Sequence, residues 1–213
     1  KRGPVTCETI FREGRVVPTL LAVIRERRAD LTVMCTHGRG GFQRMWLGSV
    51  ADGVLRGTPT PLLLVRGGRV PMPPPGAVLG QRVVVALDGS PRAEVAVAAV
   101  ERFLALATTG EIVLAHVVHP MVMAVAMRSE RRPDVEFADR YLQPMVERLR
   151  AGGRTTRAAT ATDANIARAL LGIAAEVEAD LLAITPQGLR GMSRATCAHS
   201  TDAGVRWKLE ARG

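Results

Sequence analysis

The stretch RVVVALDGSP, Arg82–Pro91, decides the fold class of this chain of 213 residues. Its apolar run is typical of a strand buried on both faces, and the Asp-Gly-Ser-Pro after it indicates a turn that opens a helix. A helix over Pro91–Ala107 and a second strand over Glu111–Val118 are predicted to follow. Strands separated by helices pair in parallel through right-handed crossovers. The stretch therefore predicts an α/β fold with a doubly wound parallel sheet, Rossmann-like or flavodoxin-like.

The same alternation of strands and helices continues toward the C-terminus. The predicted elements are a helix over Arg131–Gly153, a strand over Thr155–Thr162, a helix over Asp163–Ala179 and a strand over Asp180–Thr185. Upstream, residues 67–81 have the proline and glycine density of a linker. We therefore expect a second domain over residues 82–213 and a shorter first part over residues 1–66.

The first part repeats the end of the second domain. Val5–Arg44 aligns without gaps with Thr155–Arg194 at an offset of 150 positions, and shared residues include Ala-Asp-Leu at 29–31 and 179–181. Such a repeat predicts two tandem copies of one unit. The first copy would supply a strand from Val5, a helix, a strand, a glycine-rich loop, a helix and a closing strand in TPLLLVR, residues 60–66.

The first copy has no counterpart of the strands over Arg82–Val118. In a strand order of 3-2-1-4-5 or 2-1-3-4-5, its opening strand would not lie beside its next strand, Leu31–Cys35. Two arrangements are open. Either residues further upstream supply the strands between them, or the strands over Arg82–Val118 fill the gap in a permuted arrangement with Thr155–Thr162 paired elsewhere.

Charge and composition exclude several classes of protein. The net charge is +9, but the arginines are spread among acids and aromatic residues make up only 3%, too few for base stacking, so no nucleic-acid partner is expected. Three widely spaced cysteines form neither a disulfide framework nor a zinc site. No apolar run is long enough for a membrane span. Because the chain starts at Lys1 without an apolar leader, we expect a cytoplasmic protein whose natural N-terminus lies upstream.

A glycine-rich loop follows the strand over Leu31–Cys35 and ends at a helix that begins near Ser49. Ligands of doubly wound sheets bind beyond the carboxyl ends of the strands, and free N–H groups at a helix start favour an anion. The loop is therefore either a phosphate cradle or a plain turn in which Ser49 caps the helix. Neither a Walker A loop nor a dinucleotide fingerprint is present.

The spacing Gly38-x9-Gly48-Ser49, with the following helix and PLLLVR, resembles the C-terminal signature of the universal stress protein family. The stretches RVVVALDGSP and AHVV resemble the family's first two strands. The resemblance implies an adenine nucleotide alpha hydrolase-type fold, ATP with its accompanying Mg²⁺, and a homodimer formed through edge strands. The implied binding residues are Gly38, Arg39, Gly41, Gly48, Ser49 and Val50 for phosphate, Asp88 for the ribose and base side, and Val117 for adenine. The function it implies is stress-response regulation by a protein that is not an enzyme.

Both copies depart from the family signature. Its first glycine falls on Cys35 in the first copy and on Thr185 in the second, whose Gly-Ser pair is replaced by Ala198 and His199. The second copy also lacks an apolar closing strand. A Cβ at Cys35 would crowd a nucleotide or resist a positive φ. The alternative is therefore a universal stress protein that binds no nucleotide and acts as a dimerising regulatory interaction protein. A related nucleotidyl transferase would need a catalytic cluster that the sequence does not show.

Overall fold

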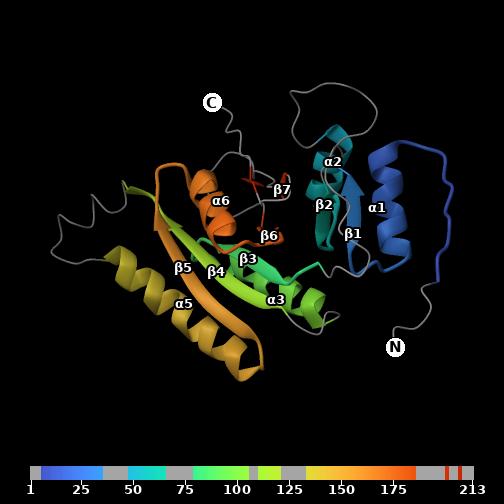
Figure 1. The fold of residues 1–213 in the computed structure, drawn as a ribbon. Helices are drawn as coiled ribbons and strands as arrows, with labels where there is room; N and C mark the ends of the chain where they lie inside the picture. The colour runs from blue at the N-terminus through green and yellow to red at the C-terminus, as the bar shows by residue number, and fades with distance from the viewer. Residues whose placement is uncertain are drawn as a thin grey trace. The chain divides into compact units, whose positions relative to one another are not determined.

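The chain forms two compact units, Lys1–Gly68 and Arg69–Gly213. The computed structural model describes residues 6–35, 48–65, 79–105, 110–120 and 133–185, and the short pairs 200–201 and 206–207 (Figure 1). The division between the units falls inside the segment predicted to be a linker, residues 67–81.

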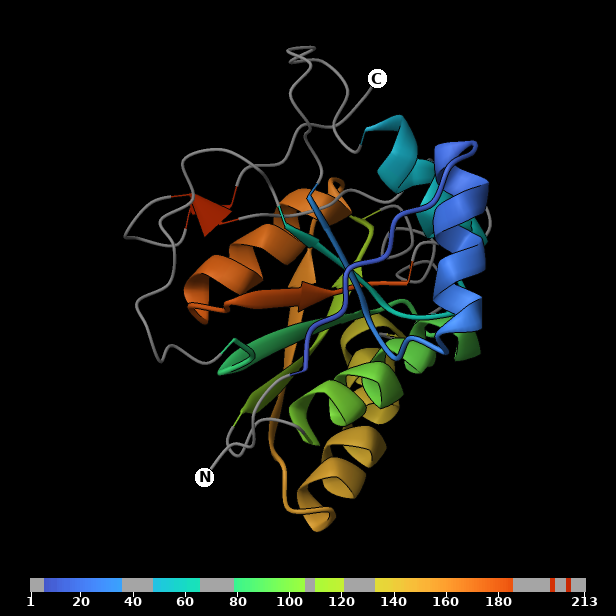
Figure 2. The ribbon, with the colours of Figure 1, turned by 90° about the vertical axis from the view of Figure 1, so that its right-hand side faces the viewer.

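The second unit contains a four-stranded parallel sheet in the order β5-β4-β3-β6. Its strands are β3 (Arg82–Leu87), β4 (Glu111–Val118), β5 (Thr155–Thr162) and β6 (Leu181–Ala183), and its helices are α3 (Pro91–Ala105), α5 (Pro133–Ala151) and α6 (Ile166–Glu176). Helices α3 and α5 cover one face and α6 covers the other (Figures 1 and 2). The predicted doubly wound parallel α/β sheet is confirmed.

Alternate residues of the central strand β3 enter two different cores, because successive side chains of a strand point to opposite faces. Val83 and Val85 pack in the core under α3 and α5. Val84 and Ala86 pack in the core under α6, with Leu170 and other α6 residues. A strand that is covered on both faces needs an unbroken apolar run, which explains the sequence of β3.

The permuted arrangement considered from the sequence is wrong. Strand β5 pairs with β4 over its whole length, from Glu111↔Thr155 to Val118↔Thr162, so it lies in the same sheet as β3. The described residues after β6 contain only a short antiparallel pair, β7 (Ser200–Thr201) with β8 (Arg206–Trp207), and no fifth strand joins the sheet among them. This agrees with the missing apolar closing strand.

The first unit contains two helices and a two-stranded parallel sheet. They are α1 (Val16–Glu26), β1 (Thr32–Cys35), α2 (Ser49–Gly57) and β2 (Leu62–Val65). Strands β1 and β2 pair from Thr32↔Leu62 to Cys35↔Val65. The two helices contact each other closely, since Cβ atoms added at Gly53 and Gly57 would meet Val17 and Leu21 at 2.8 and 2.5 Å.

The opening strand predicted from Val5 is wrong for the residues that the structure describes, because residues 6–15 form no strand. The equivalent strand of the second unit, β5, takes its hydrogen bonds from β4, and the described part of the first unit holds no counterpart of β4. Salt bridges instead tie this segment to α1 and the turn after it, from Arg12 to Glu26 at 3.4 Å and from Glu8 to Arg27 at 2.7 Å.

Helices α1 and α6 start and end at residues 150 positions apart, and so do the turns that follow them. Arg28 and Glu178 both adopt a left-handed backbone, with φ of 48° and 52°. After each turn an alanine N–H donates back to the helix, Ala29 to the Ile24 carbonyl and Ala179 to the Ala174 carbonyl. The helix bounds and the turn after the helix are therefore the same in both copies of the repeat.

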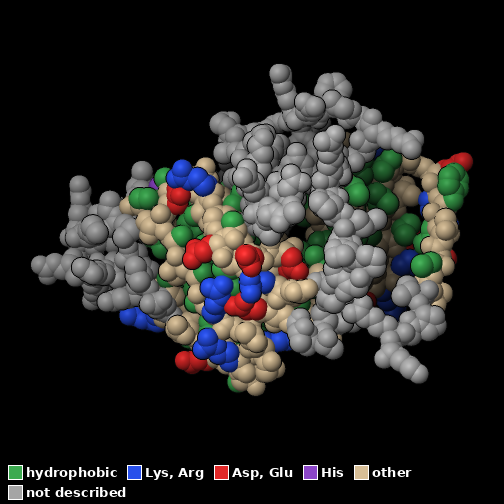
Figure 3. Space-filling view, viewed as in Figure 1, with side chains coloured by type: hydrophobic (Ala, Val, Ile, Leu, Met, Phe, Trp, Pro, Cys, Tyr) green, Lys and Arg blue, Asp and Glu red, His purple; other side chains and the backbone are tan. Residues whose placement is uncertain are grey.

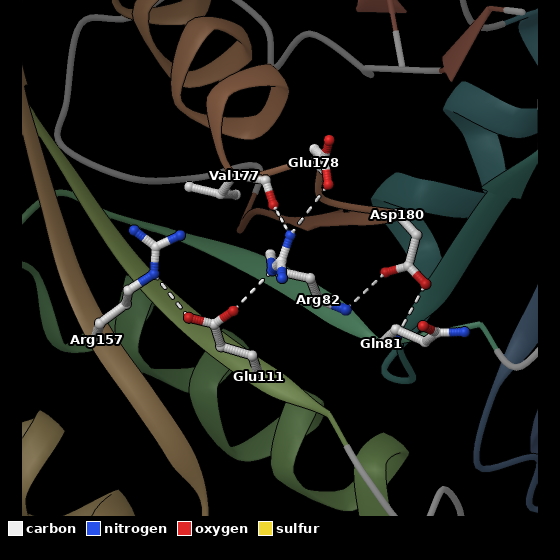
Figure 4. Close-up of polar contacts among 7 residues, drawn as sticks. All are labelled: Gln81, Arg82, Glu111, Arg157, Val177, Glu178 and Asp180. Carbon is white, nitrogen blue, oxygen red and sulfur yellow. Dashed lines mark hydrogen bonds and ion pairs between the residues drawn. The ribbon is translucent and has the colours of Figure 1, made fainter. Parts of the chain in front are cut away.

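Asp180 joins the start of β6 to the start of β3. Its Oδ2 accepts hydrogen bonds from the N–H groups of Gly80 and Gln81 at 2.8 and 2.9 Å, and its Oδ1 accepts one from Arg82 at 3.1 Å (Figure 4). Its own N–H donates to the Arg82 carbonyl at 3.1 Å. The Asp180 carboxylate therefore accepts hydrogen bonds from the backbone N–H groups at the start of β3 and just before it. Without this carboxylate these N–H groups would lack a partner among the described residues.

Glu111 at the start of β4 lies between two arginines. Arg82 and Arg157 donate to its two carboxylate oxygens, each at 2.7 Å (Figure 4). Burial alone would raise the pKa of Glu111, but the hydrogen bonds and charges of Arg157 and Arg82 outweigh it and hold the pKa below its usual value. The ion pairs join β3, β4 and β5 at the end of the sheet where these strands begin, opposite to their carboxyl ends.

Candidate functional site

Helix α2 begins where the predicted phosphate cradle of the first unit ends. Gly48 is its N-cap, with φ of 70° and ψ of 142°, a backbone that only glycine adopts readily. The first bond of the helix runs from the Asp52 N–H to the Gly48 carbonyl at 3.0 Å, so the N–H groups of Ser49 and Val50 precede the helical ladder. The reading in which Ser49 caps the helix is wrong, because the cap is Gly48 and Ser49 is the first helical residue.

The glycines of the loop itself lie outside the described residues. These are Gly38, Arg39 and Gly41, together with the loop residues around them. Cys35 is the last residue of β1 and is exposed, opposite Val65 of β2. The structure therefore describes the helix end of the predicted cradle and the strand end that leads into it.

Asp88 follows the last residue of β3, at the carboxyl end of the second unit's sheet. Its Oδ1 accepts a hydrogen bond from the Ser90 N–H at 2.9 Å, and Ser90 Oγ in turn accepts one from the Ala93 N–H at 3.2 Å. Gly89 between them has φ of 84°. This turn fixes the Asp88 side chain directly before α3.

Val117 lies beside Asp88 on the neighbouring strand. The register ends with Leu87 opposite His116, and Asp88, just after β3, and Val117 of β4 are the next residues along the two chains. Val117 is half-buried and packs against the core under α6. The structure thus brings these two predicted site residues together, at the edge of the sheet where doubly wound folds bind ligands.

A polar group that the sequence did not predict lies at the carboxyl end of the same sheet, on the face opposite to Val117. The His116 ring is buried, its Nδ1 lies 2.8 Å from the Leu87 carbonyl, and it meets the Tyr141 ring edge-on with centroids 6.3 Å apart. The Tyr141 hydroxyl donates to Glu94 at 3.2 Å. Burial, followed by the charge of Glu94, raises the pKa of Tyr141. The signal in the sequence was His116 next to Val117, since the two positions face opposite sides of one strand.

The described residues hold no group of three or more His, Cys, Asp or Glu side chains placed to bind a metal ion. None of the described helices is both long and apolar enough to cross a bilayer. The predicted binding residues are divided between the units, with Gly48, Ser49 and Val50 in the first and Asp88 and Val117 in the second.

Sequence comparison identifies one family along the chain. The pattern of the Universal stress protein family matches residues 1–66 and 80–206. A universal stress protein of Mycolicibacterium smegmatis is 40% identical over 55 residues, which are 26% of this chain and 19% of that protein. A universal stress protein of Methanocaldococcus jannaschii is 36% identical over 62 residues, 29% of this chain and 36% of that protein. The chain thus aligns with well under two thirds of either relative.

Solved structures share the fold. A universal stress protein from Archaeoglobus fulgidus superposes with a TM-score of 0.56 at 23% identity, covering 78% of this chain and 53% of that one. A putative universal stress protein from Pseudomonas aeruginosa gives a TM-score of 0.50 at 14% identity, covering 84% and 61%. At these identities the likeness shows the arrangement of strands and helices.

Proposed function

The chain belongs to the universal stress protein family, and on that premise we propose that it binds ATP or a related adenine nucleotide as a stress-response module. The observation that supports the proposal best is the backbone of Gly48. A residue held at φ of 70° immediately before α2 leaves the first N–H groups of the helix open to an anion. Val50 and the exposed Ser49 hydroxyl lie in the same first turn.

The second unit supports the same proposal through a different part of the site. Asp88 and Val117 offer a carboxylate and an apolar side chain side by side at the carboxyl end of the sheet. That pairing fits a ribose hydroxyl and an adenine ring. Bound Mg²⁺ would accompany the phosphates and neutralise part of their charge. We propose a binding role without catalysis, in which the nucleotide changes the partners that the protein engages.

The proposal is tested by calorimetric titration of ATP into the full chain and into Gly48→Ala. Alanine resists a positive φ at a cost of about 1–2 kcal/mol, so we expect binding by Gly48→Ala to be weaker by roughly tenfold. Gly172→Ala is the matched control, because a Cβ at Gly172 meets nothing within 4 Å. If the unaltered chain does not bind ATP, or if Gly48→Ala binds it equally well, this loop is not a nucleotide site.

A second variant assigns the nucleotide to a unit. Asp88→Asn keeps an oxygen that can accept from the Ser90 N–H but removes the charge. Weaker ATP binding by Asp88→Asn, with the fold intact by circular dichroism, places a nucleotide in the second unit. Unchanged binding leaves the first unit as the site.

One observation favours the second candidate, a dimerising regulatory protein. Strand β2 pairs only with β1 among the described strands, and its last residue, Val65, is 40% exposed. An open strand edge is a template for pairing with another chain. Sedimentation of the full chain in the absence of ATP tests this candidate: a dimer that Val65→Lys dissociates supports it, and a monomer contradicts it.

A further inference from the structure

The turn after β3 carries Asp88 and lies beyond the paired part of β6. Among the described residues β6 pairs with β3 only as far as Val85↔Ala183, so this pairing ends two residues before the end of β3. Gly89 continues the turn with φ of 84°. A side chain that contacts a ligand has to be held within about 0.5 Å of its binding position. Groups other than β6 must therefore fix the backbone around Asp88.

His116 of β4 holds the backbone immediately before Asp88. Its Nδ1 lies 2.8 Å from the carbonyl oxygen of Leu87, the last residue of β3. Because a carbonyl oxygen can only accept, Nδ1 carries the proton and is the donor. The His116 residue is only 9% exposed, so water competes little for this hydrogen bond. The bond thus fixes the peptide group between Leu87 and Asp88 to the neighbouring strand.

Tyr141 of α5 holds the backbone immediately after Asp88. Its ring meets the His116 ring edge-on, with centroids 6.3 Å apart and an angle of 67° between the planes, an arrangement that aromatic pairs favour. Its hydroxyl accepts a hydrogen bond from the Gly89 N–H and donates one to Glu94 Oε1 of α3 at 3.2 Å. One hydroxyl therefore ties the turn to both α3 and α5.

The surroundings of the Tyr141 hydroxyl keep it protonated. Burial raises the pKa of Tyr141 most, followed by the charge of Glu94 and the hydrogen bond to it, and then by the charge of Asp88. The Gly89 N–H acts in the opposite direction and is outweighed. The hydroxyl therefore remains a donor to Glu94 at neutral pH, and the Asp88 carboxylate lies near enough to act on it.

A second link between α3 and α5 lies away from the turn. Arg148 donates to Glu101 Oε2 at 3.3 Å. This pair lies seven residues further along each helix than Tyr141 and Glu94, which is about 10 Å along a helix. Both links join the same two helices, but of the two it is the Tyr141 hydroxyl that also binds the turn. The chain thus contains its own control for a plain contact between helices.

We propose that His116 and Tyr141 are positioning residues that hold the Asp88 carboxylate in place for a nucleotide. His116 acts through the carbonyl before Asp88. Tyr141 acts through the N–H after Asp88 and through Glu94. The inference rests on the proposed function, in which Asp88 contacts the ribose and base side of the nucleotide. It adds that the affinity depends on a tyrosine hydroxyl and a histidine N–H that do not touch the nucleotide themselves.

The first test is a double-mutant cycle of Tyr141→Phe and Asp88→Asn, with ATP titrated calorimetrically into the full chain. Tyr141→Phe removes one hydroxyl and keeps the ring, so we expect ATP binding to weaken by roughly fivefold. In the Asp88→Asn background the same change should have almost no effect, because the positioned carboxylate is already gone. Tyr141→Phe leaves the net charge unchanged, and acidic and basic side chains are interspersed over the second unit in Figure 3. The loss therefore does not come from a changed attraction of the surface for phosphate.

The second test follows the turn itself, without nucleotide. The Ser90 N–H donates to Asp88 Oδ1 at 2.9 Å, so hydrogen exchange of the Ser90 amide, measured by NMR, reports how firmly the carboxylate is held. We expect Tyr141→Phe to speed this exchange roughly fivefold. The matched control is Glu101→Met, which removes the other link between α3 and α5. It should change neither the exchange of Ser90 nor the ATP affinity by more than about twofold, as is usual for an ion pair near the surface.

Two variants of His116 separate its hydrogen bond from its packing. His116→Phe keeps a ring beside Tyr141 and loses the donor to Leu87. His116→Asn loses the ring, but its side-chain amide can donate from nearly the place of Nδ1. We expect His116→Phe to weaken ATP binding, and to speed the exchange of Ser90, more than His116→Asn does. The reverse order would overturn the positioning role of the His116 N–H.

Additive effects of Tyr141→Phe and Asp88→Asn would overturn the proposal, and so would unchanged exchange of Ser90 in Tyr141→Phe. Equal losses for Tyr141→Phe and Glu101→Met would reduce Tyr141 to a contact between helices and overturn it as well. If the chain binds ATP and Asp88→Asn binds it equally well, this proposal fails and the proposed function stands in the first unit. If the unaltered chain does not bind ATP, the proposed function fails. The exchange of Ser90 then still decides whether His116 and Tyr141 hold Asp88.

Discussion

The turn after α1 and the turn after α6 have the same backbone but very different surroundings. Both helices end in a left-handed residue and lead through Ala-Asp-Leu into a strand. In the second unit the strand beyond the turn joins a four-stranded sheet, and in the first unit it joins only β2. Local sequence therefore determines the helix end and the turn. A neighbouring strand determines how far the helix face is buried and whether the aspartate carboxylate is hydrogen-bonded.

The largest difference between the units is expected for the equivalent leucines of the two helices. Leu170→Ala should lower the free energy of unfolding of the second unit by about 3 kcal/mol, because it opens a cavity in a closed core. Leu20→Ala should cost less than about 1 kcal/mol, because Leu20 lines a hollow and is already partly exposed. Urea denaturation followed by hydrogen exchange measures each unit separately. Equal costs would mean that the α1 face is as closed as the α6 face.

A smaller difference is expected for the equivalent aspartates. Asp180→Ala removes the acceptor of three backbone N–H groups and should destabilise the second unit by about 2 kcal/mol. Asp30→Ala should change stability by less than about 0.5 kcal/mol, as is usual for an exposed side chain without a partner. Exchange rates of the β3 and β1 amides report the two effects. A large loss on Asp30→Ala would show that this carboxylate already has a structural role.

The smallest effect is expected for Glu111, whose counterpart the described first unit does not contain. The folded-state pKa of Glu111 is lowered. The stability that its charge contributes is therefore fully present above the pKa of a glutamate in the unfolded chain, about 4.3. This stability is lost as the pH falls through the lower pKa of the folded state. The unaltered chain should be more stable than Glu111→Gln by about 1 kcal/mol at pH 7. That difference should disappear as the pH falls below the lowered pKa of Glu111 in the folded chain. A difference that does not depend on pH would show that packing, not charge, is what Glu111 contributes.

The sequence predicted the second unit well because each of its elements carries a complete local signal. The apolar run of Arg82–Leu87 and the alternation of strands and helices around it determine the sheet, and the repeat predicts the bounds of α1 from those of α6. The strand expected from Val5 failed because a strand also needs a partner, which no local pattern reveals. The packing of Tyr141 against His116 could not be foreseen for the same reason, since it joins β4 to α5 across the fold.

For the candidate site, the family resemblance named Asp88 and Val117 as binding residues, and the strand register places them near each other. Gly48 was predicted as a binding residue, and its left-handed backbone explains why glycine is needed there. Its role as the helix cap, in place of Ser49, came only from the structure. Glycine and serine both occur at helix caps, so the sequence alone fits a cap at Gly48 or at Ser49. Only the dihedral angles distinguish these two positions.

The central position of β3 has a consequence for the order of folding. Its pairing with β4 closes a short connection, whereas the hydrogen bond from Arg82 to Asp180 joins residues 98 apart in the chain. During synthesis β3 is therefore complete long before the strand that closes its second edge exists, and that edge stays open to solvent and chaperones. Long-range pairing of this kind is slow, so protection at β6 should appear last when the protein refolds.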